Sequence, residues 1–360
     1  MPTDSTLLLL SLFASLLLPS PLLIASEKAD DSTKNQLLKG DIISTSLESG
    51  TRASDETPLF SQLSPTATGV DFVNPILPNH PRAHLYASAM GCGGVTVGDF
   101  DSDGLPDLFF TGGPVPSRLF RQTGDLKFKD ATIEAGLLGP ESWSTGASMI
   151  DIDNDGDLDL YVCNYDAANQ LFINRGDGTF IDEAKAYGLD FVTAGHTPAF
   201  GDLDNDGDLD LYLLTNFFYD PRGLITEPIV GMVDGKPAIL PDFEKFYGIT
   251  GVTQGAETGR ISVLHDSVGQ DDILLRNNGN GSFERISSVG ALIGKGNSAL
   301  WWDPNGDGWA DLYVANDFKD ADHFFQNGGD GSLKDVIKKA VPHTTWFSMG
   351  CDSADLDGDG

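Results

Sequence analysis

Short apolar runs separated by turn residues recur along most of the chain at a regular spacing. Four of them follow an aspartate and read Asp107-Leu-Phe-Phe, Asp159-Leu-Tyr-Val, Asp210-Leu-Tyr-Leu and Asp311-Leu-Tyr-Val. Their short length and their content of aromatic and β-branched residues predict buried strands rather than helices.

A second apolar pair follows each of these runs and leads into a turn that contains glycine. The pairs are Leu119-Phe120, Leu171-Phe172, Leu274-Leu275 and Phe324-Phe325, and three of the four turns read Gly-Asp-Gly or Gly-Asn-Gly. Such turns join antiparallel strands. Together with a strand that enters each aspartate-rich segment, every unit predicts four short strands.

The units are copies of one repeat, which we expect to determine the fold. The aspartate-rich loops begin at Asp99, Asp151, Asp202, Asp303 and Asp355, at separations of 52, 51, 101 and 52 residues. From the first aspartate of the loop to the glycine turn there are 25 or 26 residues in units one, two and four, but 77 in unit three. Unit three therefore carries an insertion of about fifty residues, at 217–269. Four strands in about 51 residues predict an all-β fold, a β-propeller of four-stranded blades.

The repeat also suggests how the chain is divided. We expect a signal peptide at 1–26, a flexible polar spacer at 27–58 and the propeller at 59–360. The blades are expected at about 88–140, 141–191, 192–291 and 292–343, with a partial blade at 344–360. Because the sequence stops inside the fifth loop, we expect about four blades and a part of a C-terminally truncated propeller.

The first residues have the features of an export signal. Leu7 to Leu18 is almost purely apolar and is followed by two prolines and by the small residues Ala25 and Ser26. No Lys or Arg precedes the apolar run, and an uncleaved membrane anchor at 7–25, interrupted by the prolines, is the alternative. We expect an exported protein that is extracellular, at the cell surface or periplasmic.

The aspartate-rich loops follow the pattern D-x-D-x-D-G-x-x-D, with carboxylates at loop positions 1, 3, 5 and 9 and glycine at position 6. Carboxylates this close repel one another unless a cation or protons neutralise them. Several oxygen ligands at flexible geometry suit Ca²⁺, and the backbone carbonyl of position 7 would add one more. The predicted calcium ligands are Asp99, Asp101, Asp103, Leu105 and Asp107 in loop one; Asp151, Asp153, Asp155, Asp157 and Asp159 in loop two; Asp202, Asp204, Asp206, Asp208 and Asp210 in loop three; Asp303, Asn305, Asp307, Trp309 and Asp311 in loop four; and Asp355, Asp357 and Asp359 in loop five. Asn305 has no charge, so loop four should bind more weakly.

EF-hands share the first six positions of this pattern but differ from these loops at later positions. An EF-hand needs a glutamate at position 12 and a helix on either side. Position 12 is here Phe110, Val162, Leu213 or Val314, each within a predicted strand. This difference excludes EF-hands, and the loops therefore belong to a β fold.

The net charge and the absence of certain sequence motifs exclude several classes of function. Lys and Arg number 22 against 54 Asp and Glu, a formal net charge of −32, which excludes recognition of nucleic acid through a basic surface. The sequence contains no GxSxG, Walker A or HExxH motif, and its three cysteines form no CxxC pair. We therefore predict no catalytic residues.

These motifs resemble those of the FG-GAP/VCBS repeat β-propellers, the architecture of the integrin α head. Ala199-Phe-Gly-Asp202 and Val97-Gly-Asp-Phe100 match the lead-in to the calcium loops of that family. More narrowly, Leu171 to Phe180, Asp311 to Asp317 and Thr344 to Gly350 resemble proteins of the ASPIC/UnbV, cartilage acidic protein-like type.

The resemblance implies a secreted or surface-exposed calcium-binding propeller, of seven blades in the full protein, that serves in binding or adhesion. Its partner would be an extracellular protein or a glycan, with no nucleic acid and no membrane insertion beyond an N-terminal anchor. The alternative is the propeller part of a secreted polysaccharide-degrading enzyme, a lyase or a hydrolase. We expect a non-enzyme, because the insertion shows no known catalytic spacing.

Overall fold

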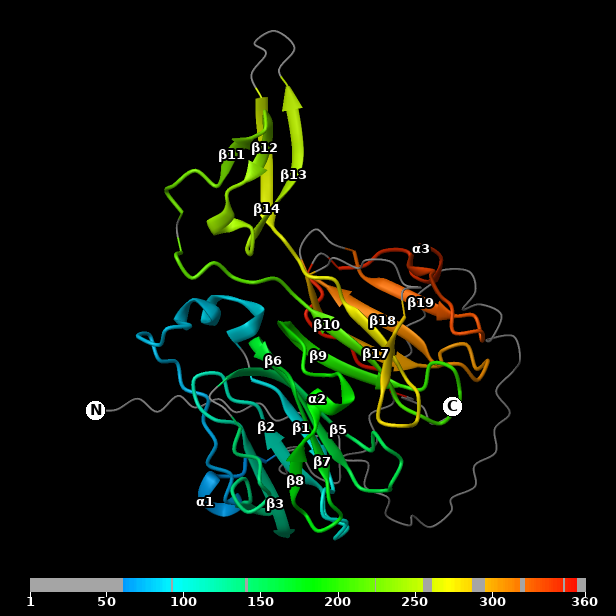
Figure 1. Cartoon of the computed structure of the whole chain (residues 1–360). Helices are drawn as coiled ribbons and strands as arrows, with labels where there is room; N and C mark the ends of the chain where they lie inside the picture. The colour runs from blue at the N-terminus through cyan, green and yellow to red at the C-terminus, as the bar shows by residue number, and fades with distance from the viewer. Residues whose placement is uncertain are drawn as a thin grey trace, which may run out of the picture. The chain divides into compact units, whose positions relative to one another are not determined.

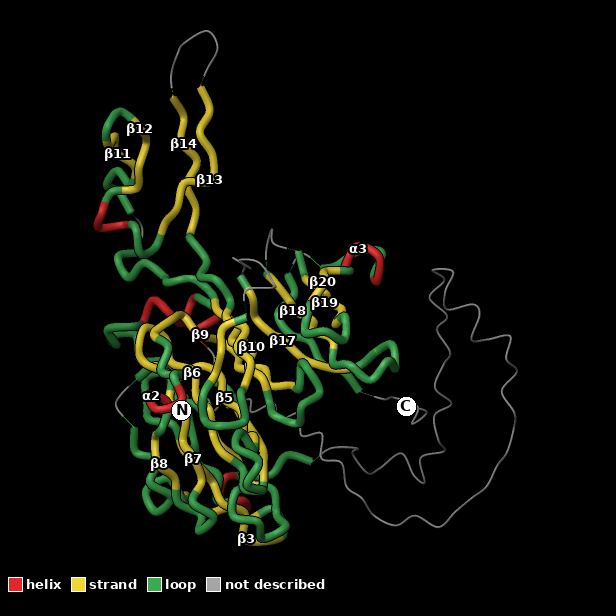
Figure 2. The backbone as a smooth tube through the Cα atoms, turned by 45° about the vertical axis from the view of Figure 1, so that its right-hand side comes forward, coloured by secondary structure: helices red, strands yellow, loops and turns green. Residues whose placement is uncertain are grey.

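The computed structural model of the protein describes residues 61–354 apart from 92, 140–141, 224, 255–260, 287–294, 318–320 and 346. All of these residues belong to one compact unit that begins at Pro58, and the expected signal peptide and spacer lie outside them. Strands and loops predominate, and helices are short (Figure 2). The α-helices are α1 (Pro65–Thr68), α2 (Ala184–Tyr187) and α3 (Ile337–Ala340), and the 3-10 helices are η2 (Ala83–Ala87), η3 (Ala89–Gly91) and η4 (Pro241–Phe243). None of these helices is long and apolar enough to cross a membrane.

Sixteen strands of the described residues form four antiparallel groups, which we call blades one to four (Figure 1). Blade one contains β1 (Val95–Gly98), β2 (Asp107–Phe110), β3 (Arg118–Gly124) and β4 (Lys127–Asp130). Blade two contains β5 (Trp143–Ile150), β6 (Asp159–Ala168), β7 (Gln170–Asn174) and β8 (Phe180–Asp182). Blade three contains β9 (Val192–Gly201), β10 (Asp210–Thr215), β15 (Ile273–Asn277) and β16 (Phe283–Arg285). Blade four contains β17 (Gly296–Trp302), β18 (Asp311–Asn316), β19 (His323–Asn327) and β20 (Leu333–Asp335).

Blades two and three join into one eight-stranded sheet because β6 and β9, each of 10 residues, extend far enough to pair with one another. The first part of β6 pairs with β5 inside blade two, and its last part pairs with β9, where Tyr165 lies opposite Ala194. Main-chain hydrogen bonds thus connect these two blades directly.

Buried side chains fill the space between consecutive blades. Leu160 of β6 shares a buried cluster with Phe109 of blade one, whereas the next residue, Tyr161, shares one with Leu211 of blade three. Successive side chains of a strand point to opposite faces of its sheet, so both faces of blade two are covered. Tyr212 repeats the pattern between blades three and four. This stacking of four-stranded sheets confirms the predicted all-β propeller fold.

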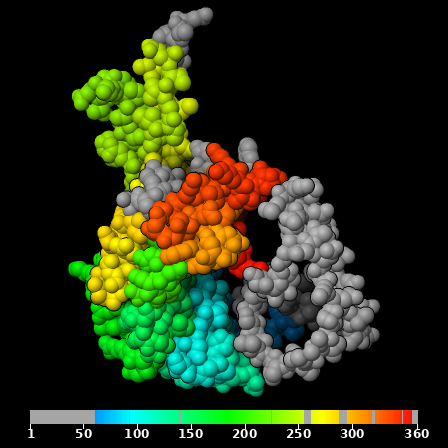
Figure 3. All heavy atoms as spheres, turned by 90° about the vertical axis from the view of Figure 1, so that its right-hand side faces the viewer, coloured from blue at the N-terminus to red at the C-terminus, as the bar shows by residue number. Residues whose placement is uncertain are grey.

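Blade three is interrupted between β10 and β15 by two hairpins, each of which forms a sheet of its own. They consist of β11 (Val230–Val233) with β12 (Lys236–Ile239), and of β13 (Tyr247–Gln254) with β14 (Ile261–Ser267). An isolated antiparallel bridge between Phe217 and Gly269 closes the base of this insertion. The hairpins protrude from the blades as a separate group of atoms (Figure 3).

Candidate metal centres

Each described aspartate-rich loop connects the first strand of a blade to the second, and the last aspartate of the loop is the first residue of the second strand. The glycine at position 6 has a positive φ, for example 95° at Gly156, a conformation that glycine adopts without strain. Position 4 of loops two and three is also left-handed, with φ of 59° at Asn154 and 56° at Asn205, a conformation that asparagine tolerates better than most residues. The loops therefore share one backbone shape at the turn.

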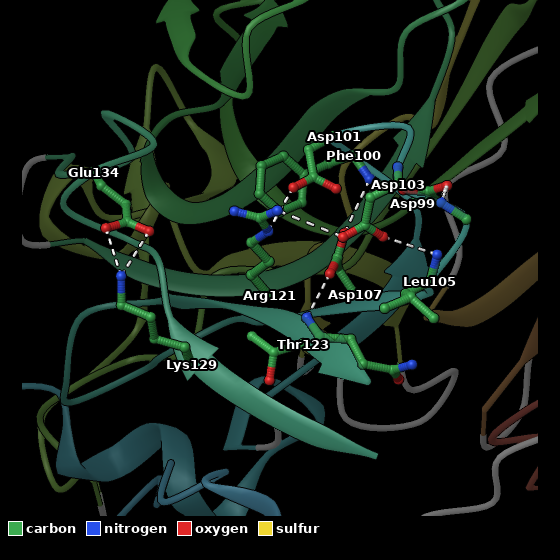
Figure 4. Close-up of polar contacts among 12 residues, drawn as sticks. Asp99, Phe100, Asp101, Asp103, Leu105, Asp107, Arg121, Thr123, Lys129 and Glu134 are labelled. Atoms are coloured by element: carbon green, nitrogen blue, oxygen red, sulfur yellow. Dashed lines mark hydrogen bonds and ion pairs between the residues drawn. The ribbon is translucent and has the colours of Figure 1, made fainter. Parts of the chain in front are cut away.

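The carboxylate at position 1 folds the loop around itself. In loop one, Asp99 accepts the N–H of Asp103 at 3.0 Å with Oδ1 and the N–H of Gly104 at 2.8 Å with Oδ2 (Figure 4). The carboxylate at position 5, Asp103, in turn accepts the N–H of Leu105 at 2.9 Å. These hydrogen bonds direct several carboxylates toward the interior of one tight turn.

The carboxylate at position 9 is buried and links the loop to the third strand of its blade. Asp159, which is 1% exposed, accepts the N–H of Ile152 at 3.0 Å and the N–H of Asn174 at 2.8 Å. Asp107 and Asp210 make the equivalent pairs of bonds. Burial raises the pKa of Asp107 to about 6 and those of Asp159 and Asp210 to about 7, although the backbone N–H groups oppose the shift.

In loop four the same position lacks one partner. Asp311 accepts the N–H of Asn327 at 2.8 Å with Oδ1, but its Oδ2 is buried without a hydrogen bond from any described residue. In the other loops the second N–H comes from position 2, and in loop four position 2 is Pro304, which has no N–H.

Three loops bring carboxylates close enough to hold one cation. One oxygen from each member lies within 4.8 Å of the others in the sets Asp99, Asp101 and Asp107; Asp151, Asp153 and Asp159; and Asp202, Asp204 and Asp206. The Oδ1 atoms of Asp101, Asp202 and Asp204 are buried without a hydrogen-bond partner among the described residues. Burial also raises the pKa of Asp101 and of Asp204, although Arg121 and Arg276 oppose the shift. Orphaned oxygens in an all-oxygen donor set fit a hard divalent cation.

Some of the predicted ligands belong to these carboxylate sets, some lie outside the sets, and those of loop five lie outside the described residues. Positions 1 and 3 gather in loops one to three, joined by position 9 in loops one and two and by position 5 in loop three. Asp103, Asp155 and Asp210 lie outside these sets, and the described carboxylates of loop four, where Asn305 interrupts the series, form no such set. Asp355, Asp357 and Asp359 lie outside the described residues.

Sequence reasoning missed three asparagines that connect loops one, two and three to the blade that follows each. Asn174, Asn277 and Asn327 end the third strands, and their Nδ2 atoms donate to the position-2 carbonyl of the preceding loop, at Phe100 (2.7 Å), Ile152 (3.1 Å) and Leu203 (2.7 Å). Each is buried and also donates to a carbonyl at position 8 of its own loop. We call them the latch asparagines. Their recurrence three residues after the first residue of the apolar pair was the available signal.

Neighbouring loops also touch directly. The Nδ2 atom of Asn154 in loop two donates to Gly207 O at 3.1 Å and to Asp208 Oδ1 at 2.7 Å in loop three. Asn205 of loop three donates to Gly308 O of loop four at 2.8 Å. Loops two, three and four therefore form one continuous row along the edge of the blades.

A row of aspartate loops at the entrance to the second strands of stacked blades defines a class of propellers with aspartate-rich loops, and the comparisons agree with that class. The profile of the FG-GAP-like repeat matches residues 99–162, 151–213 and 303–360. The chain belongs to the FG-GAP-repeat β-propeller family.

Among curated proteins, the chain is similar to cartilage acidic protein 1. The Homo sapiens protein is 29% identical over 185 residues, which cover 51% of this chain and 27% of that protein. The Mus musculus protein is 28% identical over 187 residues, which cover 51% of this chain and 28% of that protein. The match thus spans about a quarter of the length of these relatives.

Two solved structures are distant matches. One is an Agrocybe aegerita lectin described as specifically recognising non-reducing terminal N-acetylglucosamine, with 20% identity and a TM-score of 0.28 over 66% of this chain and 63% of that one. The other is a Photorhabdus luminescens Tc holotoxin pore, with 17% identity and a TM-score of 0.20 over 66% of this chain and 11% of that one. TM-scores this low bear on neither fold nor function.

Proposed function

We propose that the protein is an exported calcium-binding propeller that serves as a binding or adhesion module for an extracellular protein or glycan. The orphaned carboxylate oxygens at position 3 of loop one and at positions 1 and 3 of loop three carry this proposal. A bound Ca²⁺ would give Asp101 Oδ1, Asp202 Oδ1 and Asp204 Oδ1 the partner they lack and would offset the repulsion within each cluster. The aspartates at positions 1 and 3 would hold the ion, assisted by position 9 in loops one and two and by position 5 in loop three.

Calcium would act on the scaffold rather than bridge to the partner. Loop three enters β10 at Asp210, and the insertion leaves β10 after Thr215, at the opposite end of a strand of 6 residues. That strand is about 20 Å long. A cation in loop three is thus remote from the base of the insertion, and its effect would be to fix the loop and the blades that the latch asparagines join.

The insertion offers the surface best suited to a partner. Its hairpins expose apolar side chains, among them Met232, Val252 and Leu264. A hollow of about 400 Å³ at its base is lined by five aromatic residues together with His84 and Asp220; the aromatics are Phe217, Phe218, Tyr219, Phe246 and Tyr247. Aromatic faces beside hydrogen-bonding groups suit sugar rings and aromatic peptide side chains.

Calcium binding is tested by calorimetric titration of the full chain and of two variants of loop two. Asp153 belongs to the carboxylate cluster, whereas Asp157, at position 7, does not. Asp153→Ala should abolish or greatly weaken binding at this loop, and Asp157→Ala should weaken it only modestly through the lost charge. Equal losses would mean a diffuse acidic patch and would refute the ligand assignment.

Partner binding is tested separately, by exposing the calcium-loaded chain to glycan and extracellular-matrix protein arrays. Binding that falls in the variant Tyr247→Ala, and not in a variant of an exposed blade residue such as Lys127→Ala, would support the aromatic hollow as the contact site. Release of unsaturated or reducing ends from arrayed polysaccharides would instead support the enzyme alternative.

A further inference from the structure

The residue that precedes the latch asparagine differs among the blades, and in blades one and three its side chain lies within ion-pair distance of an aspartate of the loop. Blades two, three and four have Ile173, Arg276 and Gln326 there, and blade one has Arg121, followed by Gln122 in place of the asparagine. The chain thus provides four versions of one position beside four similar loops.

In blade one this residue is a cation that occupies the carboxylate cluster. Arg121 Nε lies 2.5 Å from Asp101 Oδ2, an ion pair whose angle falls outside hydrogen-bond geometry, and Nη2 donates to Asp103 Oδ2 at 3.5 Å (Figure 4). The residue opposite Arg121 on β4 is Lys129, which has the same charge and is paired with Glu134 at 2.9 Å. The facing residue therefore repels the guanidinium rather than drawing it away from loop one.

In blade three the guanidinium is divided between two acids. Arg276 lies opposite Glu284 on β16 and donates to it at 2.8 Å, while its distance to Asp204 Oδ2 of loop three is 3.9 Å. Glu284 therefore holds the charge mainly outside the cluster.

In blade two the position carries no charge at all. Ile173 packs partly buried against the cluster between blades two and three, and Asp151, Asp153 and Asp159 have no ion pair within the described part of the chain. Loop two thus has the full set of aspartates and no competing cation among these residues. Loop four is set apart, since Asn305 removes one carboxylate there.

We propose that Arg121 and Arg276 are built-in competitors for the calcium sites, so that the loops fill in the order two, three, one as calcium rises. The proposal rests on the proposed function. A guanidinium paired with the ligand carboxylate of Asp101 and with the neighbouring Asp103 neutralises part of the charge that attracts Ca²⁺, and this pairing has to be broken or weakened when the ion binds. The guanidinium of Arg121 is paired only with aspartates of loop one, whereas that of Arg276 is shared between Glu284 and Asp204. The protein would then respond to calcium over a wide range of concentration rather than at one threshold.

The test is calcium titration calorimetry of the full chain, its Arg121→Ile variant, which copies blade two, and its Arg121→Gln variant, which copies blade four. Because solvent screens the partly exposed Arg121, we expect the weakest class of sites to tighten only about tenfold, without a change in stoichiometry. Arg276→Ile should give a smaller gain. Lys129→Gln removes the same charge from the facing position, where the lysine pairs with Glu134 instead of the loop, and should leave the isotherm nearly unchanged.

A double variant shows whether the gain in calcium affinity arises at loop one. In Asp99→Asn, which removes the position-1 carboxylate of loop one, the further change Arg121→Ile should produce no tightening. A gain that persists there, or one equalled by Lys129→Gln, would mean a general effect of net charge and would overturn the proposal. Unchanged isotherms for both Arg121 variants, with calcium still bound by the parent chain, would also overturn it and leave the proposed function standing. Absence of calcium binding in every variant and in the parent would instead overturn the proposed function.

Discussion

Replacing Asp159 with asparagine measures how much the buried carboxylate at position 9 contributes to the fold. The carboxylate accepts two backbone N–H groups, from Ile152 and Asn174, and is 1% exposed. An asparagine side chain has one oxygen and one NH₂ group, so one of the two N–H groups would face another donor. A buried donor left without an acceptor costs about 1–3 kcal/mol.

Asp311→Asn is the matched control, because loop four already lacks the second bond. Pro304 has no N–H, and Asp311 Oδ2 has no hydrogen bond from the described residues to lose. Both substitutions remove one negative charge from an equivalent site. The difference between their effects on the free energy of unfolding therefore measures the hydrogen bond from the N–H of position 2, which loop two has and loop four lacks. We expect Asp159→Asn to lower the free energy of unfolding by about 1–3 kcal/mol more than Asp311→Asn.

The assay is urea denaturation of the full chain with a calcium chelator at pH 8, where Asp159, with a pKa of about 7, is ionised. A third comparison starts from Pro304→Ala, which restores the missing N–H in loop four and should raise the cost of Asp311→Asn toward that of Asp159→Asn. The reasoning is refuted if Asp311→Asn destabilises the original chain as much as Asp159→Asn does.

Three further predictions concern pH, the latches and calcium. Burial raises the pKa of Asp272 to about 7, although hydrogen bonds from Tyr212 and Thr215 oppose the shift. The folded state therefore keeps a proton that the unfolded chain loses above about pH 4. The contribution of Asp272 to the free energy of unfolding should thus fall between about pH 4 and 7, by at most about 4 kcal/mol. Asp272→Asn should flatten that part of the curve of unfolding free energy against pH, and an unchanged slope would contradict the assignment. Asn174→Ala, which removes two hydrogen bonds donated by Nδ2 and one that Oδ1 accepts from the N–H of Gly176, should cost about 1–3 kcal/mol in urea denaturation, whereas Asn278→Ala on the exposed turn should cost less than about 0.5 kcal/mol. Millimolar calcium should add roughly 0.4–1.4 kcal/mol for each occupied loop at extracellular affinities, so the chain should melt at a higher temperature in calcium than in chelator.

The sequence predicted the blades well because the features that define them are local. A short apolar run after an aspartate and a hairpin turn with glycine each depend on a few neighbouring residues, and the runs that begin at Asp107, Asp159, Asp210 and Asp311 are strands in the structure. Position 12 of loops one to four lies in these strands, which confirms the exclusion of EF-hands there.

The hairpins of the insertion were not predicted, although one signal was present. Asp234 and Gly235 join β11 to β12 with φ of 50° and 76°, the pair of positive angles that a type I′ turn requires. The insertion occurs once, so no repeat pointed to it.

At the candidate sites, the sequence indicated the aspartates but not what else they contact. Spacing alone does not show that Asp159 binds two N–H groups or that Arg121 lies in the first cluster, because both depend on how the third strand pairs with the second. The latch asparagines depend on still longer distances, since Asn174 and its acceptor Phe100 are 74 residues apart. Only the stacking of blades brings such residues together.

The latches also bear on how such a chain evolves. Units two and three each carry both halves of the contact: an asparagine that donates to the unit before it and a position-2 carbonyl that accepts from the unit after it. A unit copied by gene duplication and inserted between two others would find both partners in place. Because the acceptor is a main-chain carbonyl, the side chain at position 2 is free to diverge among Phe100, Ile152 and Leu203 without breaking the contact. Individual loops can therefore lose or change a cation site while the array of blades remains intact.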